Sequence, residues 1–243
     1  MGRARDRKYI NSYNEFLANS EFTKHHFQKF YGRTADVLTP PIAMDVVAPS
    51  QLKNKERIIL AVDRIVPDKC LLEMISAFRQ LVDEGRKDLK FVIIGNTDVK
   101  EKDYYQKVLD EKGNYPIEIL SDAKYEELLS WYKKALIFWH AKGYGVSNEN
   151  PLNMEHFGMT TVEAMKNGCI PVVINKAGPK EVVERIDKSL LWDDLDELKR
   201  ITSNLLDDSE RIRELQALVL KEAENYQMSV FESKVLEMVG RNV

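Results

Sequence analysis

Short apolar runs alternate with amphipathic stretches through the middle of the chain. The runs at residues 57–62 and 90–94 contain few polar positions, which is typical of strands covered on both faces of a sheet. Between them, residues 69–84 place apolar side chains one helical turn apart, at Leu71, Met74, Ile75, Phe78, Leu81 and Val82. This spacing predicts an amphipathic helix, and Gly85 stands where such a helix would end.

The same cycle continues toward the C-terminus. Asp122 is the expected N-cap of one of the following helices, and the residues from 194 onward are expected to be helical. Further strands are predicted at 116–120, 135–140, 170–174 and 189–192, and further helices at 101–112, 122–133, 160–167 and 179–186. Before residue 55 the pattern predicts only short strands near 17–20 and 37–41 around a helix at 21–31.

Strand–helix repeats of this kind predict an α/β fold, a doubly wound, Rossmann-like parallel sheet of six strands over about residues 57–192. Ligands of such sheets bind beyond the carboxyl ends of the strands, where the strand order reverses. The site is therefore expected in the loops that follow Val62, Ile94, Leu120, His140 and Ile174.

Composition narrows the classes of function. The 243 residues carry a formal net charge of −3, which argues against nucleic acid as a partner because such proteins usually carry a basic face. The two cysteines, Cys70 and Cys169, form neither a disulfide framework nor a zinc pattern and fit a reducing, cytoplasmic setting. A short basic start is interpreted as a solvated chain end, formed by Arg3, Arg5, Arg7 and Lys8.

Membrane-spanning and secretory signals are not expected from this sequence. The longest apolar runs reach only about seven residues, whereas a bilayer span needs roughly 20. No apolar segment follows the basic N-terminal residues, as it would in a signal peptide.

The stretch from Glu155 to Met165 carries the strongest chemical signal. A loop reaches Gly158 and then enters a helix near Thr160, whose first free N–H groups and helix dipole would form an anion site. Glu155 lies just before that site and Glu163 about one turn into the helix, so both carboxylates could accept hydrogen bonds from sugar hydroxyls. Thr160-x-x-Glu163 is equally a capping box, and Glu155 alone would be a solvated loop charge.

This stretch resembles the E-x7-E motif of the family-4 glycosyltransferases, retaining enzymes of the GT-B fold. Glu155 and Glu163 stand in the two glutamate positions of the frame E-x-F-G…E-A-M…G-x-x-P-V-V. The resemblance implies that Glu155 contacts the donor sugar and that Glu163 holds the ribose hydroxyls of the nucleotide. It adds four neighbouring residues to the donor contacts: Phe157, Gly158, Met159 and Thr160.

Residues 63–70 resemble a second family segment, G-R-x-x-x-x-K-G, whose Arg and Lys neutralise the diphosphate. Arg64 and Lys69 match it, whereas Asp63 and Cys70 replace the two glycines. A leaving nucleoside diphosphate gains negative charge, which fixed cations can stabilise and for which the forked donors of Arg are suited. Asp63 would put a negative charge beside this phosphate site. Without the resemblance, the two cations would be surface residues near a helix start.

Other stretches extend the resemblance over about residues 15–190. Gly178 occupies the second glycine position of the family's G-G-x-x-E-I-V turn, and residues 19–23 and 40–42 resemble its hinge region. The loop 141–154 is long enough to be a lid. The chain around this loop is similar to the mannosyltransferases that extend dolichol-linked oligosaccharides, which makes GDP-mannose a candidate donor beside UDP-sugars.

The resemblance also places the base of the donor. By analogy, the base is expected between the turn at Gly95 and the loop after Leu120, with Tyr125 close by, but guanine, uracil and adenine all remain open. His140 ends a strand at the ligand edge and is either a donor contact or a structural histidine. Asp194-x-Asp196 spells a metal-binding D-x-D but is interpreted as helix capping. Neither a metal nor another cofactor is expected.

The resemblance divides the chain into three parts. Residues 1–45 would be the tail of an N-terminal domain with its hinge, 46–225 the nucleotide-sugar-binding domain, and 226–243 a helix that crosses back to the first domain. The implied enzyme is a hexosyltransferase that moves a sugar, with retention and by a front-face route, to a glycan or lipid-linked acceptor. The first domain would bind this acceptor and make any contact with the inner face of a membrane, so the chain alone is expected to bind donor but transfer slowly.

Two alternatives stay open at this stage. One is a non-catalytic module that binds nucleotide sugars without turnover. The other is a GT-B relative with different chemistry, such as a sugar-nucleotide epimerase.

Overall fold

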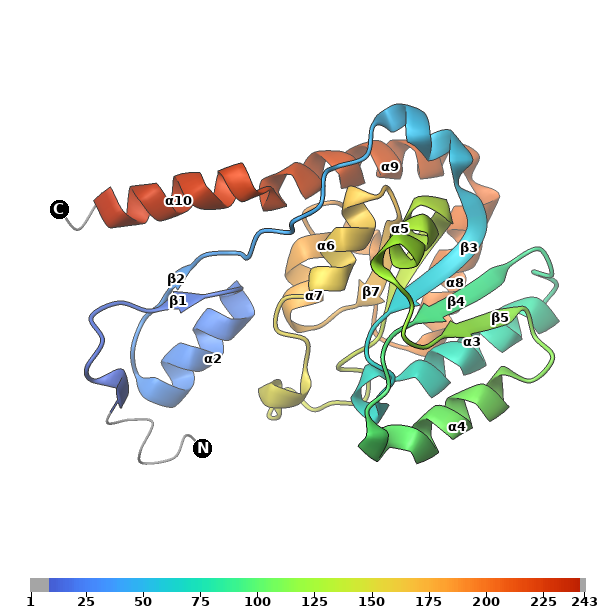
Figure 1. Ribbon diagram of the computed structural model, residues 1–243, viewed down its shortest axis with the longest axis horizontal. Coiled ribbons are helices and arrows are strands. Elements are labelled where there is room, and N and C mark those ends of the chain that lie inside the picture. Colours follow the sequence, from blue (N-terminus) through green and yellow to red (C-terminus); the bar gives the residue numbers. More distant parts are fainter. Residues whose placement is uncertain (1–8, 241–243) are drawn as a thin grey trace.

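A six-stranded, fully parallel sheet forms the centre of the molecule in the computed structural model, which describes residues 9–240 (Figure 1). Its strands follow the order β5-β4-β3-β6-β7-β8, so the chain builds outward from β3 to one edge and then returns to the other side of β3. The bounds are β3 (Glu56–Val62), β4 (Lys90–Ile94), β5 (Ile117–Leu120), β6 (Ala135–His140), β7 (Ile170–Ile174) and β8 (Leu191–Trp192). The predicted doubly wound α/β fold is confirmed, and its switch point lies between the ends of β3 and β6.

Helices cover both faces of the sheet because its strands are apolar on both sides. Along β3, Ile59 and Ala61 enter one core with α3 (Leu71–Asp83) and α8 (Leu195–Asp207). Ile58 and Leu60 enter a second core with α5 (Tyr125–Lys134) and α6 (Met159–Lys166). Alternate residues of a strand point to opposite faces, which explains the near-continuous apolar runs of the sequence.

The remaining elements complete the chain. The helices are α2 (Glu21–Tyr31), α4 (Lys102–Lys112), α7 (Ala177–Val183), α9 (Ser209–Ala223) and α10 (Met228–Gly240). The short 3₁₀ turns are η1 (Pro49–Asn54), η2 (Pro67–Lys69), η3 (Val99–Glu101), η4 (Pro151–Asn153), η5 (Lys188–Leu190) and η6 (Glu224–Tyr226). The basic start of the sequence, residues 3–8, lies outside the described part of the chain.

The predicted cap of α5 is wrong. Asp122 does not begin the helix but adopts a left-handed backbone with φ of 60°, and α5 starts at Tyr125 after Lys124 in the N-cap position. Aspartate tolerates this backbone better than most residues, so it serves the turn that follows β5 instead of the helix. Gly85 does follow the end of α3 with a positive φ of 109°, as its position predicted.

A small unit precedes the main domain. Strands β1 (Leu17–Ala18) and β2 (Asp36–Val37) pair in parallel beside α2, apart from the six-stranded sheet (Figure 1). The carboxylate of Glu181 on α7 accepts a 2.8 Å hydrogen bond from the backbone N–H of Glu21 at the start of α2. Ser20 donates a 2.6 Å hydrogen bond to the carbonyl of His156. These contacts hold the unit against α7 and against the loop that precedes α6.

The two ends of the main domain meet beside α6. The ammonium of Lys166 is buried and donates to the carbonyls of Ile42 and Met44 at 2.8 and 2.7 Å. The backbone N–H of Ile42 donates to the carbonyl of Tyr226 at 3.0 Å. From here α10 extends away over the small unit, and none of its described residues is buried (Figure 1). Within residues 9–240, no helix is both long and apolar enough to cross a membrane.

Candidate active site

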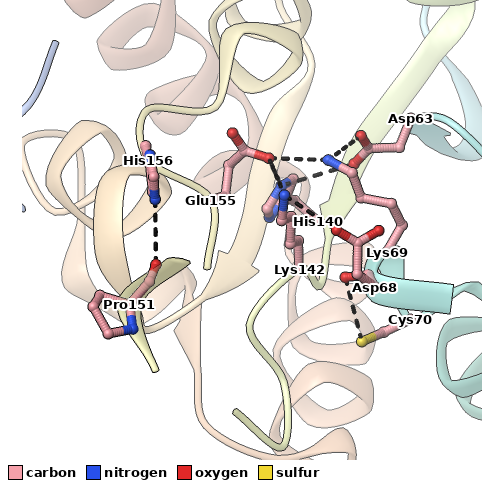
Figure 2. A network of polar contacts seen from close by, with 9 residues as sticks. All are labelled: Asp63, Asp68, Lys69, Cys70, His140, Lys142, Pro151, Glu155 and His156. Atoms are coloured by element: carbon pink, nitrogen blue, oxygen red, sulfur yellow. Dashed lines mark hydrogen bonds and ion pairs between the residues drawn. The ribbon is translucent and has the colours of Figure 1, made fainter. Parts of the chain in front are cut away.

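The candidate site lies at the carboxyl ends of β3 and β6, where the order of the strands reverses. Asp63 directly follows β3, and His140 is the last residue of β6. Figure 2 shows these two side chains pointing toward Lys69, which comes from η2, and toward Glu155, which comes from the loop before α6. Four side chains from four segments of the sequence therefore converge at the crevice that the fold reserves for ligands.

Lys69 is the centre of this cluster. Its side chain is 93% buried, and its ammonium contacts the carboxylates of both Asp63 and Glu155, the second at 2.9 Å. Burial alone would lower the pKa of Lys69, but the two carboxylates outweigh it and raise that pKa, so the side chain stays protonated. Its charge is already shared between two carboxylates, and its predicted contact with the diphosphate stays a prediction.

His140 stands behind the ion pair. Only 2% of the residue is exposed, and its Nε2 lies 3.9 Å from a carboxylate oxygen of Asp63 and 3.9 Å from one of Glu155. Burial by itself would raise the pKa of Glu155, but the adjacent His140 and Lys69 hold it well below its usual range. Burial also raises the pKa of Asp63. His140 and Lys69 lower that pKa, but by less than burial raises it.

Two glycines set the position of Glu155. The N–H of Gly178 donates to the carbonyl of Glu155 at 3.0 Å, and a Cβ at Gly178 would lie 2.3 Å from the carbonyl oxygen of His156. Only glycine permits this approach of two backbones. Gly158 then turns the chain into α6 with a φ of 92°, a conformation that side chains rarely adopt. The glycines of the predicted motif are therefore explained by backbone geometry.

Glu163 does not form the capping box that the sequence left open. The N-cap of α6 is Gly158, which has no side chain, and Thr160 already lies inside the helix. The carboxylate of Glu163 instead accepts a 2.8 Å hydrogen bond from the phenol of Tyr132 on α5. It is only partly buried, so it is held in one orientation and remains open to a ligand.

Replacing Tyr132 by phenylalanine should test this orientation. The variant keeps the buried ring and removes only the hydroxyl that holds Glu163, so the free energy of unfolding should fall by about 1 kcal/mol. Affinity for a nucleotide that contacts Glu163 should weaken by roughly fivefold because the carboxylate is no longer oriented. Urea titration and calorimetry measure the two effects, and Tyr115→Phe on the far side of the sheet, where the hydroxyl contacts Asp83, is the matched control. Equal affinity losses in both variants would contradict a specific role of Tyr132.

The other predicted contacts divide into two groups. Met159 and Thr160 begin α6 on the open side. Arg64 is exposed, and its backbone carbonyl accepts a 3.0 Å hydrogen bond from the N–H of Val66. Phe157 is buried in a third hydrophobic cluster with Ile42 and Val162, so its side chain cannot contact a donor and only its backbone could. A donor contact of Phe157 stays a prediction, for its backbone alone.

The residues expected near the base lie farther along the strand ends. Gly95 packs directly against the backbone of Asp63, and its N–H donates to the carbonyl of Leu120 at 3.1 Å. Tyr125 is exposed and lines a hollow of about 390 Å³ between α5 and residues 43–48. Leu120 is half-buried against the second core and contributes its backbone to this edge.

Sequence reasoning missed several members of the site. Lys142 lies 3.3 Å from Asp68 and 4.0 Å from Glu155, and no motif marked it (Figure 2). Tyr132 is the buried residue of α5, and no motif marked its hydroxyl as a partner of Glu163. Lys176 donates to the carbonyls of Gly143 and Val146 at 3.2 and 2.8 Å. These hydrogen bonds hold the first half of the loop 141–154, the predicted lid, in place.

Asp194 behaves as the capping interpretation predicted. Its carboxylate accepts a 2.8 Å hydrogen bond from the backbone N–H of Glu197 and begins α8. In the part of the chain that the structure describes, no group of three or more His, Cys, Asp or Glu side chains is arranged to hold a metal ion. The metal-free site stays a prediction.

The fold and the glutamate pair define the class of protein. A family model described as "Glycosyl transferases group 1" matches residues 45–218, and this chain belongs to that family. Its relatives include proteins named GDP-Man:Man(3)GlcNAc(2)-PP-Dol alpha-1,2-mannosyltransferase. The one from Neurospora crassa is 26% identical over 202 residues, which cover 70% of this chain and 34% of the relative. The one from Dictyostelium discoideum is 24% identical over 249 residues, which cover 92% and 46%.

Solved structures show the same fold. Anabaena HepE in complex with UDP and glucose superposes with a TM-score of 0.77 at 17% identity, covering 98% of this chain and 66% of that protein. The pneumococcal O-GlcNAc transferase GtfA in complex with UDP and GlcNAc gives a TM-score of 0.73 at 16% identity, covering 98% and 47%. The chain therefore spans about a third to a half of the curated relatives and about half to two thirds of these structures.

Proposed function

We propose that this chain binds a nucleotide-sugar donor and supplies the donor half of a retaining glycosyltransferase. The observation that carries the proposal is the convergence of Lys69, Glu155 and the oriented Glu163 at the switch point of the sheet. Ligands of doubly wound sheets bind at this place, and a nucleotide sugar needs cations for its diphosphate and carboxylates for its hydroxyls.

The proposed role of each group follows from its position and charge in the site. The exposed Arg64 and the first turn of α6 would meet the diphosphate together with Lys69, and all three would stabilise the charge that develops on the leaving nucleotide. Glu155 would orient the sugar and Glu163 the ribose. No residue of this cluster is assigned as a covalent nucleophile, so front-face transfer without a metal remains the preferred mechanism.

GDP-mannose is the preferred donor and a lipid-linked oligosaccharide the preferred acceptor. The names of the curated relatives contain both, which supports this preference. The two solved structures described above were obtained with UDP, so a UDP-sugar is the alternative donor. Acceptor contacts are assigned to a second Rossmann-like domain, toward which α10 would extend. Rapid transfer by these 243 residues alone would contradict that assignment.

Calorimetric titration with GDP-, UDP- and ADP-sugars tests the proposal. One of them should bind, and Glu163→Ala should weaken it by about tenfold or more, since hydrogen bonds to a charged group contribute roughly 1.5–3 kcal/mol. Glu210→Ala, an exposed glutamate on α9, is the matched control and should leave the affinity unchanged. Binding should survive addition of a chelator. Failure of every nucleotide sugar to bind would reject the proposal, and equal losses in the two variants would reject the role of Glu163.

A further inference from the structure

Two carboxylates share one ammonium at the centre of the site. Lys69 contacts both Asp63 and Glu155, so these three side chains together hold more negative than positive charge. We propose that binding of a nucleotide-sugar diphosphate is coupled to the uptake of one proton by Asp63, which acts as a positioning residue for Lys69. The inference rests on the proposed function, because it takes the diphosphate as the ligand.

A phosphate cannot reach Lys69 without also approaching Asp63. Any oxygen that accepts a hydrogen bond from this ammonium lies within two hydrogen-bond lengths, about 6 Å, of the Asp63 carboxylate. An esterified diphosphate brings about two negative charges into this buried place, where salt screens charges poorly. A like charge favours protonation of the group beside it, so the ligand and a proton should bind together.

Asp63 can take this proton. Its carboxylate contacts the ammonium of Lys69 and lies 3.9 Å from Nε2 of His140, and Glu155 shares the same ammonium. Burial raises the pKa of Asp63, and the second carboxylate of Glu155 raises it further, whereas His140 and Lys69 offset this rise only in part. The carboxylate of Asp63 is therefore brought closer to protonation.

Other titratable groups lie around Asp63. Lys69 has a raised pKa and Glu155 a lowered one, so both remain ionised near neutrality. Tyr132, which approaches from α5 and contacts Glu163, has a pKa well above its usual value and remains neutral. Lys142 and Asp68 pair with each other at 3.3 Å, so their charges offset one another.

Calorimetry of GDP-mannose and UDP-glucose binding tests the coupling, since an esterified diphosphate does not itself titrate near neutrality. Titrations from about pH 6 to about pH 8.5, in buffers of different ionisation enthalpy, count the protons taken up. The unmodified chain should take up about one proton per ligand in the upper part of this range, where its Kd should rise about tenfold per pH unit. Asp63→Asn should bind with no uptake and a flat profile. Asp68→Asn, which removes an exposed carboxylate of the same loop, should keep the original slope.

The outcomes separate the two proposals. A flat profile in the unmodified chain, or the same slope in Asp63→Asn, would overturn the proton coupling while leaving donor binding in place. Absence of binding at every pH would overturn both. If Asp63→Asn does not fold, His140→Gln replaces it: a shifted midpoint of the pH profile supports the coupling, and an unchanged profile overturns it.

Discussion

Lys69→Met should lower the affinity for the nucleotide sugar by about 100-fold and the free energy of unfolding by about 3 kcal/mol. Methionine fills the space of the lysine stem but leaves Asp63 and Glu155 without their shared cation in a largely buried place. Removing one partner of a buried ion pair costs about 3–5 kcal/mol because the remaining charge stays desolvated. The loss of affinity comes from the missing contact to the diphosphate and from the uncompensated carboxylates. Urea titration and calorimetry measure the two effects separately.

A second substitution distinguishes the roles of Lys69 in stability and in binding. The double variant Asp63→Asn/Lys69→Met removes one of the two stranded carboxylates, so it should regain part of the lost stability. It should not regain the affinity, because no ammonium remains to meet the diphosphate. Lys107→Met, an exposed lysine on α4, is the matched control and should change the unfolding energy by less than about 0.5 kcal/mol. Full recovery of affinity in the double variant would show that Lys69 does not contact the ligand.

Gly95→Ala should lower the melting temperature by roughly 10 °C and weaken donor binding as well. A Cβ at this position would lie 1.6 Å from the carbonyl oxygen of Asp63 and 2.7 Å from its carbonyl carbon. The obstacle is backbone, so no rotation of a side chain can relieve the contact. The end of β3 must move away, and Asp63 with its ion pair to Lys69 must move with it. Overpacking of this kind costs about 1–3 kcal/mol or more.

Gly240→Ala is the matched control for this effect. It makes the same chemical change in α10, where nothing lies within 4 Å of the added carbon. Alanine favours a helix by up to about 1 kcal/mol over glycine, so this variant should melt at the same temperature or slightly higher. Differential scanning calorimetry compares the two variants. Equal melting temperatures for Gly95→Ala and the unmodified chain would contradict the close approach of β3 and Gly95.

The alternation of apolar runs and amphipathic stretches was enough to predict the strands, the helices between them and the parallel sheet. Helices and strands leave a periodic pattern of apolar residues in the sequence. A strand covered on both faces of a sheet leaves a short, continuous apolar run. The rule that ligands bind at the carboxyl ends of parallel strands then located the crevice, and the E-x7-E frame located Glu155 and Glu163. All of this was readable from the residues and from a family resemblance.

Tertiary structure alone decided how the charges of the site are arranged. Asp63 looked unfavourable beside a phosphate site, yet it shares the ammonium of Lys69 with Glu155, which lies 86 positions after Lys69 in the chain. Tyr132 orients Glu163 from a neighbouring helix, and a capping box was the equally good local alternative. The residues 122–124 show the same limit, since Asp122 has the right side chain for a cap but lies in a turn. Sequence patterns record which side chains avoid water, whereas the partner of a buried charge depends on which loops the fold brings together.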